Sequence, residues 1–150
     1  MKKHSELGKE LFLSGYNCSQ AVIGAFCEEL GLSFETAMKL SSSFGGGMGR
    51  LREVCGAVSG AFMVLGLKYG DFDCKNHADK SKHYERIQRF AERYKELNGS
   101  IICRELLGLN EKGASVPAPE VRTEKYYKKR PCVNLVEMSC ELLDEFLGEE

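Results

Sequence analysis

The sequence predicts an all-α protein: a single domain over residues 1–150 that forms a bundle of five to seven helices. Apolar residues recur at helical spacing through most of the chain, and no stretch alternates between apolar and polar residues as a half-buried strand would. With 150 residues, of which 43% are hydrophobic, one domain can bury enough apolar surface to fold without disulfides or a metal.

The first third of the chain carries clear helix boundaries. A first helix is expected over about residues 5–14. Asn17, with Gln20 three residues later, has the pattern of an N-cap with a capping box, so a second helix is expected to begin at Cys18. Ser33 is the expected N-cap of a third helix.

The middle of the chain joins a glycine cluster to the most apolar segment. Four of the five residues over 45–49 are glycine, which predicts a tight loop. Residues 51–69 then predict a central helix with Cys55 on its apolar face. Gly56 and Gly60 lie one turn apart in it, and glycine inside a helix costs about 1 kcal/mol against alanine. We therefore expect another group to approach this helix closely.

The second half continues the helical pattern around one loop. A charged amphipathic helix is expected over about residues 76–97, and Ser100 is the expected N-cap of a short helix that contains Cys103. A loop with two prolines covers residues 110–121. The last helix is expected to begin near Pro131.

Charge and hydropathy argue against two classes of partner. The chain has 21 basic and 22 acidic residues, and its one basic cluster, at 125–130, is expected to be a solvated face leading into the last helix, so no nucleic-acid partner is expected. The longest wholly apolar run, 61–67, is too short to span a bilayer, and the N-terminus lacks the apolar core of a signal peptide. We expect a cytoplasmic protein without a membrane partner, in a compartment that keeps thiols reduced.

Seven cysteines are many for such a protein, and their odd number and irregular spacing do not fit a secreted disulfide framework. Cys18, Cys103 and Cys132 each fall in the first turn of an expected helix, where unpaired N–H groups and the helix dipole lower the pKa of a thiol. Cys55 lies instead in the central helix, beside small residues. We predict that these four cysteines form the functional set, whereas Cys140 fits a core position of the last helix.

The glycine loop is a second candidate site. Successive backbone N–H groups ahead of a helix can hold an anion, and Arg50 and Arg52 would add positive charge. No strand precedes the loop and no Gly-Lys-Ser/Thr follows it, so a nucleotide or flavin site is the minor interpretation. The major interpretation is a tight turn against the cysteine-bearing helices. The residues concerned are Gly45, Gly46, Gly47, Gly49 and Arg50.

The chain resembles the C_GCAxxG_C_C family of redox-active proteins over roughly residues 5–145. The resemblance lies in the order and spacing of NCSQ at 17–20, FGGGMGR at 44–50, CGAVSG at 55–60, CRELLG at 103–108, and Cys132. One residue departs from the family pattern, because Val54 stands where glycine precedes the central cysteine. The resemblance implies a helical fold and redox or metal chemistry at Cys18, Cys55, Cys103 and Cys132, but it supplies no substrate.

Three functions remain open. In the favoured one, Cys18 and Cys55 cycle between dithiol and disulfide, or one attacks and the other resolves, with Cys103 and Cys132 as a second pair or relay serving a redox partner or small molecule. In the second, the same four cysteines ligate zinc or an iron–sulfur cluster. In the third, the chain is a helical interaction module whose cysteines are incidental. Apolar stripes of this strength also favour a homodimer.

Overall fold

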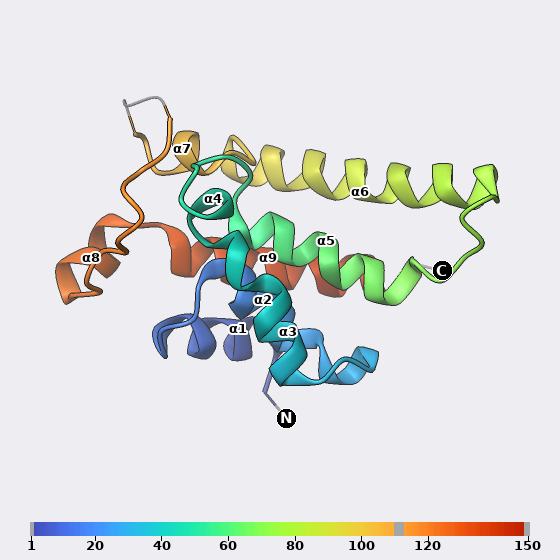
Figure 1. Ribbon diagram of the computed structural model, residues 1–150, viewed down its shortest axis with the longest axis horizontal. Helices are drawn as coiled ribbons and strands as arrows, with labels where there is room; N and C mark the ends of the chain where they lie inside the picture. The colour runs from blue at the N-terminus through green and yellow to red at the C-terminus, as the bar shows by residue number, and fades with distance from the viewer. Residues whose placement is uncertain (1, 110–112, 149–150) are drawn as a thin grey trace.

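The computed structural model describes residues 2–109 and 113–148, and this part of the chain is all-α, without a strand (Figure 1). The helices are α1 His4–Leu13, α2 Cys18–Phe26, α3 Phe34–Ser41, α5 Gly56–Tyr69, α6 His77–Asn98, α7 Cys103–Leu106, α8 Glu124–Lys129 and α9 Cys132–Leu147, with 3-10 turns η1 Glu28–Leu30 and η2 Ser42–Phe44. A further segment, α4 Gly45–Met48, has left-handed backbone inside it and is not a regular helix.

The described residues thus form eight α-helices, and the predicted range of five to seven was too low. The additional helix is α8, in the basic stretch that the sequence suggested would only lead into the last helix. Thr123 explains why a helix forms there, because its side chain accepts a hydrogen bond from the Tyr126 N–H and caps the first turn. Residues 113–121 are non-helical, as predicted, whereas 110–112 of that predicted loop lie outside the described residues.

The helices pack around α2, α5 and α9. α2 lies against α1, α3, α5 and α9, α1 runs along α9, and the long α6 covers α5 and α9 from the other side (Figure 1). Fully buried side chains from these helices form the core, among them Phe12, Val22, Val58, Phe90 and Leu143. None of the described helices combines the length and apolar character needed to span a membrane.

The predicted start of α2 is confirmed in detail. The Asn17 side chain accepts a hydrogen bond from the Gln20 N–H at 2.9 Å, and the Gln20 side chain accepts one from the Asn17 N–H at 3.1 Å. Such a cap contributes about 1 kcal/mol to stability. Asn17 also donates to the Ser42 carbonyl at 3.2 Å, which ties the start of α2 to the segment before the glycine loop. Cys18 is therefore held as the first residue of its helix. Ser33 caps α3, again as predicted.

The predicted start of the central helix is wrong. α5 begins at Gly56, and Cys55 is its N-cap residue rather than part of its apolar face. The preceding residues run antiparallel beside the chain that leads into α7. The Cys55 N–H donates to the Ile101 carbonyl at 2.8 Å, and the Cys103 N–H donates to the Glu53 carbonyl at 2.6 Å. This pairing holds the chain extended up to Cys55 and brings the segment of Cys55 alongside the segment of Cys103.

The predicted cap of α7 also differs in detail. The N-cap residue is Ile102, not Ser100. Ser100 lies in the turn before this N-cap residue. Its hydroxyl accepts a hydrogen bond from the Ile102 N–H at 2.9 Å and donates one to the Glu105 carboxylate. The serine thus organises the turn before α7 rather than its first helical residue.

The close approach expected at the central helix is made by the backbone of α2. A methyl group on Gly60 would lie 2.7 Å from the Ser19 carbonyl oxygen, whereas one on Gly66 of the same helix would have no atom within 4 Å. We expect Gly60→Ala to lower the free energy of unfolding by about 1 kcal/mol or more, because the helices must separate. Gly66→Ala is the matched control and should raise it by up to about 1 kcal/mol. Urea denaturation of both variants measures the difference, and equal stabilities would contradict the close packing.

Candidate functional site

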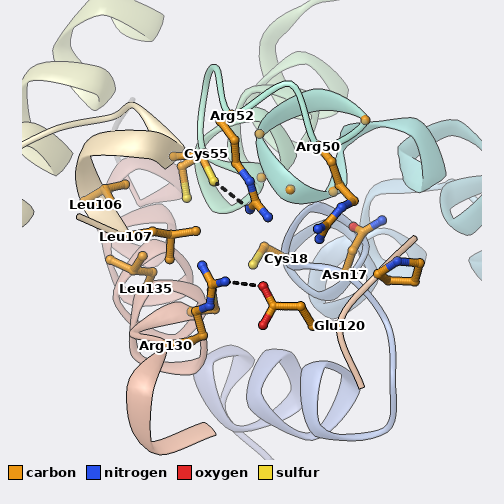
Figure 2. A pocket seen from close by; sticks show the side chains of 18 of the residues that line it. Asn17, Cys18, Arg50, Arg52, Cys55, Leu106, Leu107, Glu120, Arg130 and Leu135 are labelled. Carbon is orange, nitrogen blue, oxygen red and sulfur yellow. Dashed lines mark hydrogen bonds and ion pairs between the residues drawn. The ribbon is translucent and has the colours of Figure 1, made fainter. Parts of the chain in front are cut away.

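All four cysteines of the predicted set meet at one pocket of about 400 Å³ (Figure 2). Cys18, Cys103 and Cys132 are the first residues of α2, α7 and α9, and Cys55 directly precedes α5. Each of the four therefore stands where a helix begins, including Cys55, for which the sequence suggested otherwise. All seven cysteines are free thiols.

Cys18 and Cys132 share a hydrogen bond, and this contact shifts the pKa values of the two thiols in opposite directions. It is the largest influence on both thiols: it raises the pKa of Cys18 well above its ordinary value and lowers the pKa of Cys132 to about 7. Burial acts against the Cys132 thiolate, whereas the positive charges of Arg130, Arg122 and Arg52 favour it. At neutral pH, the site therefore holds a protonated thiol, Cys18, next to a thiol whose ionised form is favoured, Cys132.

The prediction of a lowered pKa at every helix start is therefore wrong for two of the three cysteines. The pKa of Cys18 is raised, first by its hydrogen bond to Cys132 and then by burial. Burial also raises the pKa of Cys103, although Arg52 donates a hydrogen bond to its sulfur at 3.5 Å. At Cys103, the cost of removing a thiolate from water exceeds the stabilisation that the first turn of the short α7 can provide.

Cys55 is a buried, protonated thiol. Burial raises its pKa to about 11, even though the nearby Tyr94 hydroxyl stabilises the charged form. The Cys55 sulfur lies 3.7 Å from the Tyr94 hydroxyl oxygen, and Tyr94 is itself fully buried. Helical periodicity identifies Tyr94 as an inward-facing residue of α6, but nothing in the sequence pairs it with Cys55.

The glycine loop lies directly against the cysteines. Residues 46–50 all have positive φ, a left-handed run that includes the non-glycine residues Met48 and Arg50. A methyl group on Gly47 would lie 2.6 Å from the Cys103 Cβ, and one on Gly45 would lie 2.6 Å from the Asn17 Cβ. These contacts confirm the prediction of a tight turn against the cysteine-bearing helices. All five residues of this candidate site line the pocket.

Four arginines surround the cysteines. Arg52 is only 5% exposed, and its Nε donates to the Ser115 hydroxyl at 2.8 Å. Arg122 donates to the carbonyls of Phe12 and Tyr16 at the end of α1, at 2.5 Å and 2.8 Å. The remaining two are Arg50 and Arg130.

The sequence singled out Arg50 and Arg52 next to the glycine loop, but it missed Arg122 and Arg130. Those two stand on either side of α8, far along the chain from the glycine loop. No local pattern connects them to the site, so only the fold brings them there.

The same four cysteines do not form a ready-made metal centre. Among the described residues, no three histidine, cysteine, aspartate or glutamate side chains are grouped so that they could hold one metal ion. What the side chains do form is one hydrogen-bonded cysteine pair, Cys18 with Cys132, and two buried thiols beside it.

Comparison with known proteins identifies the chain by its family. No curated protein and no solved structure matches it. The family model described as "Putative redox-active protein (C_GCAxxG_C_C)" matches residues 16–146, a span that holds all four cysteines of the pocket and the glycine loop. The chain therefore belongs to the C_GCAxxG_C_C family.

Proposed function

We propose that this protein is a thiol–disulfide oxidoreductase in which Cys132 is the nucleophile and Cys18 is the resolving cysteine. The observation that carries the proposal is that these two thiols meet in one pocket, at the first residues of α2 and α9, where the interaction between them lowers the pKa of Cys132. It provides an ionised sulfur at neutral pH and a second sulfur within reach of it. An attacking thiol is most effective when its pKa is close to the ambient pH.

The reaction follows from the two acidities. The Cys132 thiolate attacks a substrate disulfide, forms a mixed disulfide and releases one substrate thiolate. Cys132 then carries no charge, so the largest of the interactions that raised the pKa of Cys18 is gone, and Cys18 loses its proton to the departing thiolate. The Cys18 thiolate attacks the Cys132 sulfur and releases the second substrate thiolate, which takes a proton from water. Two electrons pass from the protein dithiol to the substrate, and the reverse sequence oxidises a dithiol.

This assignment changes the expected partners. The sequence suggested Cys18 with Cys55, but the hydrogen bond of Cys18 is made with Cys132. The segment that ends at Cys55 pairs with the segment that ends at Cys103, and both thiols line the pocket, which supports them as the second pair or relay. Such chemistry suits a cytoplasmic protein, where thiols start reduced. Zinc or iron–sulfur binding by the same four cysteines stays a prediction that metal analysis tests.

Disulfide mapping tests the proposal. We expect hydroxyethyl disulfide, a neutral oxidant, to convert the reduced protein to a form with one Cys18–Cys132 disulfide, which dithiothreitol reverses. Peptide mass spectrometry under non-reducing conditions identifies the bond. Cys18→Ser should stop at a mixed disulfide on Cys132, whereas Cys140→Ser, which changes a core cysteine, should still form the bond. A reversible bond between Cys18 and Cys55, or none at all, would overturn the assignment.

A further inference from the structure

We infer that the pocket takes a small thiol or disulfide substrate that carries a carboxylate close to its reacting sulfur. The sulfur chemistry in this inference rests on the proposed function. The charge and size of the substrate are inferred independently of that chemistry, from the residues that surround the cysteines.

The pocket is lined by an excess of positive charge, whereas the protein as a whole has a small negative net charge. Four arginines line it, and Glu120 is the single carboxylate among the described residues that line it, so, before the Cys132 thiolate is counted, the excess is three positive charges, four minus one. The whole chain has a formal net charge of -1. The positive charge is therefore concentrated around the cysteines, and guanidinium groups match the planar, two-oxygen geometry of carboxylates.

Two of the four arginines are held in place by hydrogen bonds to other parts of the protein, and the guanidinium groups of the other two face the open space of the pocket. Arg52 and Arg122 are held by the hydrogen bonds described above. Arg50 uses its Nε to bind the Val116 carbonyl at 2.7 Å. In Figure 2 the guanidinium ends of Arg50 and Arg130 point, from opposite sides, toward the space next to the Cys18 sulfur.

A carboxylate already occupies one of these positions. Arg130 donates a hydrogen bond to the Glu120 side chain, which reaches the pocket from the segment before α8 (Figure 2). The Glu120 side chain is 44% exposed, so its carboxylate can leave without unfolding any buried structure. A substrate carboxylate of the same geometry can replace it, and a second one can bind Arg50.

The size and walls of the pocket limit the rest of the molecule. About 400 Å³ lies at the lower end of the range for small-ligand sites. Phe12, Leu106, Leu107 and Leu135 line the pocket beside the charged groups, and such apolar walls suit the methylene groups that link a carboxylate to a sulfur. With a dicarboxylate disulfide, the two attacks described above yield two carboxylated thiols and the Cys18–Cys132 disulfide, so the disulfide itself is the oxidant.

Paired alkylating reagents measure the charge preference. Iodoacetate and iodoacetamide have almost the same size and the same leaving group, but only iodoacetate is an anion. The rate ratio of iodoacetate to iodoacetamide is measured by peptide mass spectrometry at Cys132 and at the exposed Cys74 of the same molecules. Because the thiolate attacks both reagents and displaces iodide from each, the ratio does not depend on the degree of ionisation. We expect the ratio at Cys132 to exceed that at Cys74 by about tenfold.

A matched pair of variants locates the source of the preference. Arg50→Gln should lower the ratio at Cys132 by about threefold or more, because it removes one pocket guanidinium. Arg93→Gln makes the same change of charge on α6, outside the pocket, and should leave the ratio unaltered. Equal ratios at Cys132 and Cys74 in the unmodified protein would overturn the inference and leave the proposed function standing.

A second measurement needs no reactive cysteine. Cys132→Ser cannot form the mixed disulfide at position 132, and at pH 6 ordinary thiols hold too little thiolate to exchange quickly, so calorimetric titration at that pH with dithiodipropionate, a dicarboxylate disulfide, reports binding. We expect it to bind at least about tenfold more tightly than the neutral hydroxyethyl disulfide, and less tightly after addition of Arg50→Gln. Equal affinities would overturn the inference. If Cys132 resists iodoacetamide while dithiodipropionate still binds selectively, the proposed function fails and the anion site stands.

Discussion

Replacing Gly47 with alanine is expected to lower the free energy of unfolding by about 2–5 kcal/mol, the largest effect of any single methyl group that we foresee in this protein. Gly47 has a φ of +71°, a conformation that costs an L-residue about 1–2 kcal/mol. Its new Cβ would also lie 2.6 Å from the Cys103 Cβ and 2.8 Å from the Cα of Arg52. One of these neighbours is backbone, so no side-chain rotation relieves the clash.

Gly49→Ala provides the matched control for this substitution. Gly49 lies in the same left-handed run, with a φ of +61°, but the nearest atom to its added Cβ is 3.7 Å away. The two variants share the backbone strain and differ in the close approach to Cys103. Urea denaturation should therefore show a small loss for Gly49→Ala and a much larger one for Gly47→Ala. Equal losses would mean that the loop does not press against α7.

The destabilisation caused by Gly47→Ala should also change the reactivity of a cysteine in the pocket. Gly47→Ala pushes apart the loop and the start of α7, and Arg52 connects the same loop to the Cys103 sulfur. We expect Cys103, only 7% exposed in the unaltered protein, to react with iodoacetamide faster in this variant than in Gly49→Ala. Peptide mass spectrometry after a timed exposure measures that difference.

Local signals in the sequence were sufficient for most of the helices. Asn17 and Gln20 specify the start of α2 within four residues, because both hydrogen bonds of the capping box are made inside the first turn. The glycines at 45–49 likewise predict a tight loop from their own backbone freedom, without reference to any other segment. These signals place Cys18 and the loop correctly, since no other part of the chain is needed to interpret them.

Contacts between distant segments account for the errors. Apolar periodicity runs back to Leu51 and therefore predicts helix through Cys55, yet the backbone there pairs with residues near Ile101 instead. The same pairing brings the segment of Cys103 alongside the segment of Cys55. Arg122 and Arg130 reach the pocket only through the fold, although they do much to set the acidity of Cys132. A helix start fixes the position of a thiol, but its pKa depends on burial and on charges from elsewhere.

The pH dependence of alkylation at Cys132 is the second large effect. With a pKa of about 7, the Cys132 rate with neutral iodoacetamide should rise through pH 7 and level off above pH 8. An ordinary cysteine thiol, with a pKa of about 8.5, would be only about 3% ionised at pH 7. Cys132→Ser should abolish this neutral-pH reaction, while Cys74 continues to be labelled as an exposed reference.

Removing the hydrogen bond should move the whole profile in a known direction. The Cys18 thiol stabilises the charged form of Cys132, so Cys18→Ala raises the pKa of Cys132 and shifts the midpoint to higher pH. At pH 6, below both midpoints, the rate should fall by about tenfold, whereas above pH 9 the variant and the unaltered protein should converge. Cys18→Ser is the matched control, because its hydroxyl can still donate to the Cys132 sulfur and should hold the midpoint closer to 7. If Cys18→Ala keeps the original midpoint, the arginines alone ionise Cys132, and Cys18 would act only as the resolving thiol.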